Sequence, residues 1–220
     1  SASSNNIFKN KIYNMNSLCS GLGLINGITL NNGSSIVYNN LISGLSNSNS
    51  TNTDAIRGIS IRSTAINTLN QIYNNTIYLT GSGGTNFGGT GIYHVASSVS
   101  TTSNLILKNN LIIMLLTPNG TGYNVAYRRS SNALNVLNNY STLSNNNLFY
   151  AGIPSSINLI FSDGFNLIQN LPGFISGSFT SGNINPRESN SVTENSFQVG
   201  QYFASINGIS SNFLKPINGL

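Results

Sequence analysis

The acidic side chains of this chain are few, which limits the chemistry that it can perform. The 220 residues include four carboxylates, Asp54, Asp163, Glu188 and Glu194. Hydrolysis of a glycosidic bond uses two carboxyl groups about 5 to 9.5 Å apart. In the coiled arrangement predicted below, Asp54 and Asp163 lie about three coils, or roughly 14 Å, apart, and both glutamates fall in the C-terminal segment. We therefore expect no cooperating pair of carboxylates. Because a calcium ion needs several carboxylates, we also expect no metal ion or other cofactor.

Proton abstraction by a base has one candidate group. His94 is the only histidine of the chain, and a metal-free lyase could use it together with Arg57 or Arg128. We expect His94 and Arg57 on neighbouring coils of one strand stack. The simpler interpretation is a strand histidine with one edge in solvent and an arginine lying over it. We favour this interpretation and expect no catalytic residue; an enzyme would use His94, Arg57 and Arg128.

The same part of the chain is better suited to binding than to catalysis. Neutral amides, hydroxyls and tyrosine rings can hydrogen-bond to sugars and stack on them. The candidate ligand-binding residues on or next to the predicted strand stack are Arg57, Tyr93, His94, Tyr123, Tyr127 and Arg128. A polysaccharide is therefore a candidate partner. Packing of the tyrosines on neighbouring coils is the alternative role for these rings.

The composition narrows the remaining classes of partner. Charged residues make up 6% of the chain, and its net charge is +5. The basic residues are scattered, whereas a nucleic-acid-binding domain usually concentrates them on one face, so we expect no nucleic-acid partner. No apolar run approaches the roughly 20 residues of a membrane-spanning helix, so we expect no membrane insertion. Cys19 is the single cysteine, which excludes an intramolecular disulfide.

A pair of asparagines recurs at nearly constant spacing and predicts the architecture. The pairs are Asn39 and Asn40, Asn74 and Asn75, Asn109 and Asn110, and Asn145 and Asn146. They lie about 35 residues apart, and a self-similar period of 20 to 50 residues is typical of stacked repeats. The apolar neighbours keep the same register, with Val37, Ile72, Leu107 and Leu143 two residues before each pair and Ile42, Ile77, Ile112 and Leu148 two residues after it.

The pattern around each pair predicts short strands joined by an asparagine turn. Apolar residues alternate on both sides of the pair, which is typical of strands. Asparagine enters the left-handed region at low cost and its amide bonds nearby backbone, so a pair can turn the chain sharply. A further strand precedes each pair, at 21–24, 55–59, 91–95 and 122–125. We therefore predict an all-β solenoid with about three strands per coil, each pairing in parallel with its equivalent in the next coil.

This frame resembles the right-handed parallel β-helix proteins of the pectate-lyase type, whose turns are often lined with a stacked asparagine ladder. Residues 167–171, 188–192, Phe197 and 212–218 are similar to the closing segment of secreted bacterial β-helix domains, above all in long surface proteins of Bacteroidetes-like bacteria. The repeats along the chain predict about five or six coils. Residues 1–163 would form coils, and residues 164–220 the last coil and a C-terminal cap of the same domain. The resemblance also implies an extracellular location on a bacterial cell surface.

One tripeptide resembles a catalytic element of enzymes with this fold. Asn52, Thr53 and Asp54 match the Asn-Thr-Asp element of polygalacturonase-type glycosidases, but the paired Asp, the Gly-His-Gly and the Arg-x-Lys that accompany it there are absent. We therefore expect a non-catalytic extracellular module, structural or adhesive, which binds a glycan weakly or contacts neighbouring modules of the same surface protein. The alternative is a polysaccharide lyase or glycosidase that acts on an acidic polysaccharide.

The start of the repeat raises a separate question. An open solenoid end exposes unpaired strand edges, so we expect something to cover the coil that begins at Asn5. Because the sequence begins with Ser1 and not with Met, we also expect a mature product or a segment of a longer secreted chain.

Overall fold

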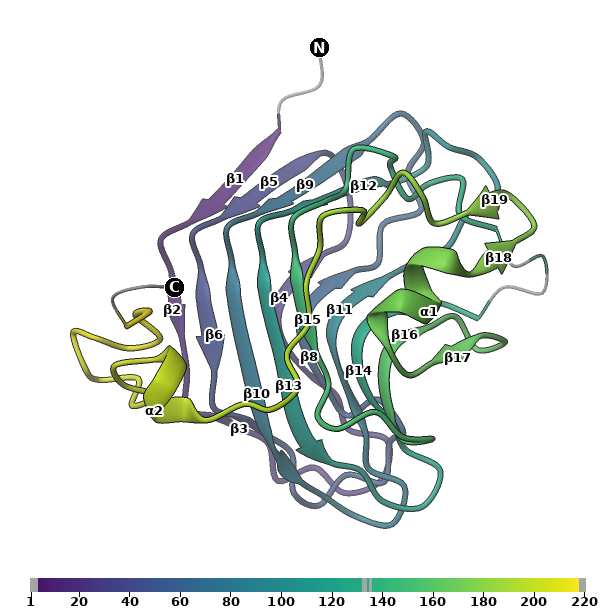
Figure 1. The fold of residues 1–220 in the computed structure, drawn as a ribbon. Coiled ribbons are helices and arrows are strands. Elements are labelled where there is room, and N and C mark those ends of the chain that lie inside the picture. Colours follow the sequence, from purple (N-terminus) through teal and green to yellow (C-terminus); the bar gives the residue numbers. More distant parts are fainter. Residues whose placement is uncertain (1–3, 132–133, 135, 218–220) are drawn as a thin grey trace.

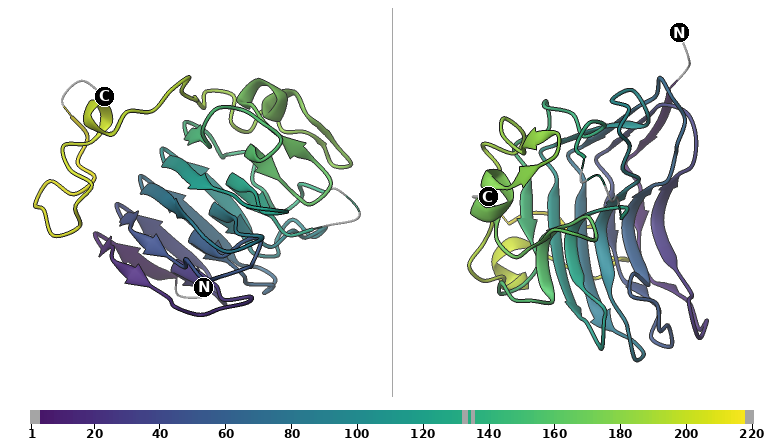
Figure 2. Two further views of the ribbon diagram at one scale, coloured as in Figure 1. Left: turned by 90° about the horizontal axis from the view of Figure 1, so that it is seen from below. Right: turned by 90° about the vertical axis from the view of Figure 1, so that its right-hand side faces the viewer.

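The protein is a parallel β-solenoid, as predicted (Figure 1). The computed structural model describes residues 4–131, 134 and 136–217. Three sheets run along the stack, each built from strands of successive coils. The first coil lies at one end of the stack, and the segment that contains α1 (Leu171–Ser176) covers the other end (Figure 2).

The strands of each sheet follow one another in chain order. Sheet 1 contains β1 (Asn5–Phe8), β5 (Ser35–Tyr38), β9 (Leu69–Tyr73) and β12 (Asn104–Lys108). Sheet 2 contains β2 (Lys11–Ile12), β6 (Leu41–Ser43), β10 (Thr76–Ser82), β13 (Leu111–Thr117) and β15 (Leu148–Tyr150). Sheet 3 contains β4 (Ile25–Leu30), β8 (Ile56–Ile61), β11 (Gly89–His94), β14 (Asn124–Arg129), β16 (Asn158–Ser162) and β17 (Leu167–Ile168). The remaining elements are the strand pairs β3 (Met15–Asn16) with β7 (Leu45–Ser46) and β18 (Ser178–Phe179) with β19 (Gly182–Asn183), and α2 (Val199–Tyr202).

The stack has about four coils, fewer than the five or six expected. After β16 the chain does not begin another coil, because β17 turns back and pairs with β16 antiparallel. Helix α1 then lies over the end of the core, where Phe174 is fully buried. The Asn170 side chain begins this helix by accepting a hydrogen bond from the Gly173 N–H at 2.8 Å. The return strand and the helix thus occupy the place of a further coil.

The first strand of sheet 3 also lies later than predicted. Residues 21–24 were expected to be a strand, but β4 begins at Ile25, and Leu22 is 79% exposed. Gly21 has a φ of 73°, which is a turn conformation. The buried side chains that face the core are Ile25, Ile28 and Leu30.

The turns that follow β5, β9 and β12 each contain two asparagines with different roles. The first asparagine turns the chain in the left-handed region, with φ of 55° at Asn39, 53° at Asn74 and 56° at Asn109. The second points inward and is buried, at Asn40, Asn75 and Asn110. The Nδ2 of Asn40 donates to Oδ1 of Asn75 at 2.9 Å, and Nδ2 of Asn75 donates to Oδ1 of Asn110 at 3.0 Å. The predicted asparagine stack therefore exists, formed by the second member of each pair.

The fourth pair was predicted in the wrong register. Asn147, and neither Asn145 nor Asn146, continues the ladder by accepting from Nδ2 of Asn110 at 3.0 Å. Asn146 takes the turn position with a φ of 61°. The separation between Asn110 and Asn147 is 37 residues, against 35 between Asn75 and Asn110, which displaces the expected positions.

The predicted apolar positions on either side of the fourth turn are also displaced by one residue. Phe149, and not Leu148, pairs with Ile112 and is fully buried in the core. Leu143 is 58% exposed, whereas the neighbouring Ser144 is buried and its Oγ accepts a hydrogen bond from the Leu107 N–H at 3.1 Å. A hydroxyl and a phenyl ring therefore fill the places predicted for two leucines.

The ladder ends on a buried carboxylate. Nδ2 of Asn147 donates to Oε2 of Glu188 at 2.8 Å. The hydroxyls of Tyr140 and Ser191 donate to the same carboxyl group. Burial raises the pKa of Glu188, while these three hydrogen bonds act in the opposite direction. An ionised carboxylate only accepts hydrogen bonds, so Glu188 terminates the series of donors.

The outer face of sheet 2 is covered by the C-terminal strap, which we define as residues 197–217 (Figure 1). Phe203 packs edge-on against Tyr78 with ring centroids 5.8 Å apart, and Ile113 of β13 is buried in the same apolar cluster. No backbone–backbone hydrogen bond joins the strap to the coils in the described part of the chain. Polar links run through side chains, such as Lys11 Nζ to Ser210 O at 3.1 Å.

Candidate functional site

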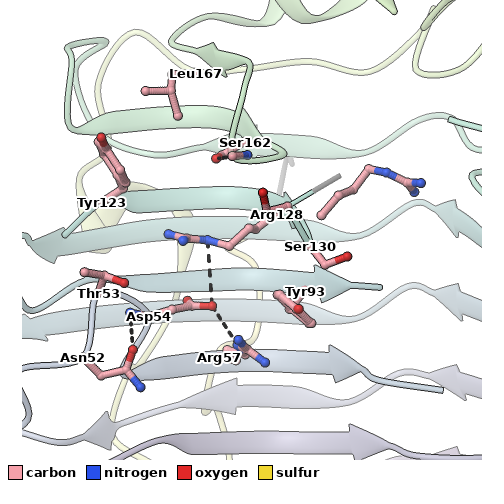
Figure 3. Close-up of a pocket in the computed structure, with 13 residues that line it drawn as sticks. Asn52, Thr53, Asp54, Arg57, Tyr93, Tyr123, Arg128, Ser130, Ser162 and Leu167 are labelled. Atoms are coloured by element: carbon pink, nitrogen blue, oxygen red, sulfur yellow. Dashed lines mark hydrogen bonds and ion pairs between the residues drawn. The ribbon is translucent and has the colours of Figure 1, made fainter. Parts of the chain in front are cut away.

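A polar cavity of about 350 Å³ lies on sheet 3 and is the candidate functional site (Figure 3). Strands β8, β11 and β14 place Arg57, Tyr93 and Arg128 there, because the register pairs Tyr93 with Arg128 and Thr90 with Arg57. Tyr123 comes from the loop before β14. The sheet thus brings together four of the predicted ligand-binding residues.

Asp54 is the centre of this cavity, although the sequence analysis did not include it among the ligand-binding residues. Its Oδ2 lies 2.8 Å from Nε of Arg57 and 3.8 Å from Nε of Arg128. Its Oδ1 accepts the hydroxyl hydrogen of Thr90. The Asn52 side chain holds the Asp54 backbone N–H at 2.9 Å, which fixes the loop that precedes β8. Both oxygens of the carboxylate are therefore engaged.

Arg57 is held in place from two sides. Its guanidinium carbon lies 3.6 Å from the centroid of the Tyr93 ring, which is a cation–π contact. Its Nη1 donates to the Ser60 hydroxyl at 3.2 Å. Together with the ion pair to Asp54, these contacts make Arg57 a rigid part of the cavity wall.

Arg128 has unused hydrogen-bonding capacity. Its Nε and Nη2 are inaccessible to water and have no hydrogen-bond partner among the described residues. The 3.8 Å separation from Asp54 is an ion pair, but it is too long for a hydrogen bond. A buried donor without a partner is costly, and a ligand would relieve this cost only if Arg128 moved so that these two atoms reached the cavity surface.

Three serines complete the polar lining and could not be predicted from the repeat. Ser130 and Ser131 follow β14, and Ser162 ends β16. The register places Ser162 beside Arg128. A further signal for the cavity in the sequence was the Asn52, Thr53 and Asp54 tripeptide, since all three residues line it.

Two of the predicted ligand-binding residues do not reach the cavity. His94 and Tyr127 are both 0% exposed. His94 ends β11 with its ring inside the coil, where Nε2 lies 2.9 Å from Ser103 O and Nδ1 lies 3.0 Å from Nη1 of Arg129. The arginine beside the histidine is therefore Arg129, and neither Arg57 nor Arg128. The expectation that His94 has an edge in solvent was wrong, and the set His94, Arg57 and Arg128 is not assembled.

The buried environment also sets the charge of the histidine. Burial, and then the positive charge of Arg129, hold the pKa of His94 well below its ordinary value of 6.5, although the hydrogen bond to Ser103 acts in the opposite direction. His94 is therefore neutral at physiological pH. Its Nε2–H donates to the Ser103 carbonyl, and Nδ1 accepts from Arg129. These contacts stabilise the interior of the coil.

The other acids do not supply the cavity with a second carboxylate. Asp163 is buried, and its Oδ1 accepts from the N–H groups of Phe165 and Asn166 within its own turn. Glu188 terminates the ladder. Within residues 4–131, 134 and 136–217, no three His, Cys, Asp or Glu side chains gather as metal ligands would. No helix in the described part of the chain combines the length and the apolar character that a membrane span needs.

The fold and this cavity define a β-solenoid protein with a polar, arginine-lined cavity on one of its sheets. Comparison of the chain with models of protein families, with curated proteins and with solved structures finds no match. The function must therefore be inferred from the cavity itself.

Proposed function

We propose that the protein is a non-catalytic, extracellular β-solenoid module that binds a glycan in the sheet 3 cavity and serves in adhesion or as a spacer. The observation that carries this proposal is the state of Asp54. Among the described residues it is the one carboxylate lining the cavity, and Arg57, Arg128 and Thr90 occupy its two oxygens. A carboxylate held in this way positions the arginines and is poorly suited to proton transfer.

The rest of the cavity matches the chemistry of sugars. Hydroxyl groups of a sugar can exchange hydrogen bonds with the serine hydroxyls of the lining, next to the Arg128 side chain. The Tyr93 and Tyr123 rings add half-buried aromatic surface. Because Arg57 and Arg128 face one carboxylate, the cavity has an excess of positive charge, which favours a glycan with acidic groups.

The extracellular location of the module is also part of the proposal. The asparagine frame and the closing segment resemble those of bacterial β-helix surface proteins of the pectate-lyase type, and this resemblance supports an extracellular, Bacteroidetes-like origin. A stack of hydrogen-bonded coils is also a stiff element, which suits a spacer or an adhesive arm between neighbouring modules.

Binding to a panel of neutral and uronate-containing oligosaccharides, measured by calorimetry and by chemical-shift changes, tests the proposal. We expect weak binding that Arg128→Ala reduces about tenfold or more, because a positive charge of the cavity wall is lost. Tyr38→Ala, on sheet 1, is the matched control and should bind as the wild type does. Absence of binding across the panel, or binding that Arg128→Ala leaves unchanged, would contradict the glycan site.

The same panel tests the enzymatic alternative. Incubation with polysaccharides followed by analysis of chain length and unsaturated ends detects lyase or glycosidase activity. Shortened products that wild type forms and Asp54→Asn does not would replace the module proposal by an enzyme acting on an acidic polysaccharide.

A further inference from the structure

We propose that a second cavity, on the outer face of sheet 2, binds a small primary amine that carries a short apolar chain. This sheet 2 cleft has a volume of about 300 Å³ and lies where the chain that leads to α2 crosses the sheet (Figure 1). The exposed turn residues Asn109 and Asn146 border it on one side. The cleft shares no lining residue with the sheet 3 cavity, so the two sites can be tested separately.

The floor of the cleft is apolar because three neighbouring side chains face outward. Alternation in sheet 2 buries Ile112 and Phe149 in the core and turns Leu111 and Leu148 to the outer face. The register pairs Leu111 with Leu148, and a parallel bridge pairs Leu148 with Val192. At about 4.8 Å per layer, the three side chains extend over roughly 10 Å. The floor can therefore cover an extended alkyl chain of a few carbon atoms.

Glu194 supplies a negative charge at the cleft wall. The other carboxylates are engaged elsewhere, since Asp54 pairs with two arginines and Asp163 and Glu188 are buried among hydrogen-bond donors. Glu194, in contrast, is half-buried and forms no ion pair with a described residue. No lysine or arginine of the described ranges lines the cleft. The charge of Glu194 is thus complementary to a cation from solution.

Tyr202 forms the neighbouring part of the wall and adds a second polar group. Its ring stacks on Phe197, with centroids 4.4 Å apart, which fixes its position. Burial, and then the hydrogen bond to Glu194 and the charge of that carboxylate, raise the pKa of the Tyr202 hydroxyl. A phenol that donates to a carboxylate keeps the lone pairs of its own oxygen. The carboxylate and the hydroxyl can therefore both accept hydrogen bonds from one ligand group.

This combination of groups selects one class of ligand. Two acceptors at a negative charge require a cation that donates hydrogen bonds, which a primary ammonium does and a quaternary ammonium does not. The apolar floor requires carbon next to the ammonium, so an amino sugar covered with hydroxyl groups would gain little from it. Each methylene group that the floor buries should strengthen binding by up to about fourfold.

Titration of the full chain with hexylamine, followed by calorimetry and by chemical-shift changes, tests the site. We expect the signals of Leu111, Leu148 and Tyr202 to move, with a dissociation constant on the order of 1 mM or lower that rises as salt is added. Butylamine should bind several-fold more weakly, because its chain is shorter. Hexanol, which has the chain without the charge, should bind about tenfold more weakly or worse.

Variants of the cleft separate its groups. Glu194→Gln keeps the shape of the side chain and removes its charge, so hexylamine should bind about tenfold more weakly or worse. Tyr202→Phe keeps the ring and removes the hydroxyl, which should weaken binding about fivefold. Gln201→Ala, at an exposed position beside Tyr202, is the matched control and should bind as the wild type does. Arg128→Ala, in the sheet 3 cavity, should also leave amine binding unchanged, and amide exchange of β13 and β15 verifies that each variant stays folded.

Three results would overturn the proposal. One is the absence of chemical-shift changes at the cleft with millimolar hexylamine. Another is equal affinity of hexylamine for the wild type and for both Glu194→Gln and Tyr202→Phe, or equal affinity of the wild type for hexylamine and hexanol. The third is much tighter binding of glycyl-lysyl-glycine than of butylamine, which has the same chain, since the ligand would then be a lysine of a partner protein and not a small amine.

Discussion

The asparagine ladder leads to a quantitative prediction for Asn110→Ala. The Asn110 side chain is fully buried and makes four hydrogen bonds, two from Nδ2, to Ile72 O and Asn147 Oδ1, and two at Oδ1, from the N–H and Nδ2 of Asn75. At about 1 kcal/mol for each bond, the substitution should lower the free energy of unfolding by about 4 kcal/mol. The partners left unpaired in the core would add to this loss.

The matched control is the neighbouring turn residue. Asn109 is exposed and has a φ of 56°. Glycine adopts this conformation at no steric cost, so Asn109→Gly should change the free energy of unfolding by no more than about 0.5 kcal/mol. The two variants thus separate the ladder from the turn, although both asparagines belong to the same repeated pair.

Denaturant unfolding followed by circular dichroism measures both variants. For a chain of this length, a loss of about 4 kcal/mol corresponds to a decrease in Tm of about 8 to 16 °C. Equal m-values for wild type and variant are required, because a stacked repeat can lose its cooperativity. A loss below about 1 kcal/mol for Asn110→Ala, or one equal to that of Asn109→Gly, would refute the assignment of stability to the ladder.

Two further predictions concern the interior of the coils. In Gly91→Ala, the new Cβ would lie 2.4 Å from Cγ2 of Ile112, so the free energy of unfolding should fall by about 2 kcal/mol. The control is Gly200→Ala, whose new Cβ would have no atom within 4 Å and which should be near neutral in the same thermal scan. The pKa of His94 is lowered in the fold, so as the pH falls the unfolded chain binds a proton at this residue before the folded chain does. The contribution of neutral His94 to the free energy of unfolding is therefore complete above about pH 6.5 and declines below it. His94→Asn should therefore flatten the pH dependence of the free energy of unfolding between pH 6.5 and 5 by up to about 1.4 kcal/mol per pH unit, and an unchanged slope would contradict the neutral buried histidine.

The fold was predictable because its determinants are local and repeated. A strand and an asparagine turn are each indicated by residues that are close together in the sequence. The regular spacing of these patterns then indicates that they stack as coils. The same reasoning failed where the spacing changes: the 37-residue interval before Asn147 moved the fourth turn by one residue. The number of coils was overestimated since the antiparallel β17 and the buried Phe174 of α1 close the stack through tertiary contacts.

The site was only partly predictable, because alternation places residues on a face but does not show which loop closes over it. Arg57, Tyr93, Tyr123 and Arg128 line one cavity as a strand stack implies. His94 was misplaced although alternation in β11 puts it on the face opposite to Tyr93, and its register partners Ile61 and Arg129 are buried as well.

The C-terminal strap has a mechanical consequence. It lies on sheet 2 through apolar contacts and side-chain links, with no backbone–backbone hydrogen bond to the coils among the described residues. A force applied at the C-terminus would peel these contacts one after another, before it loads the ladders of the stack. At about 3.4 Å per residue, the released segment from Phe197 to Ile217 would lengthen into a tether of roughly 70 Å while the coils stay folded. The strap would thus yield first and spare the stack from sudden tension.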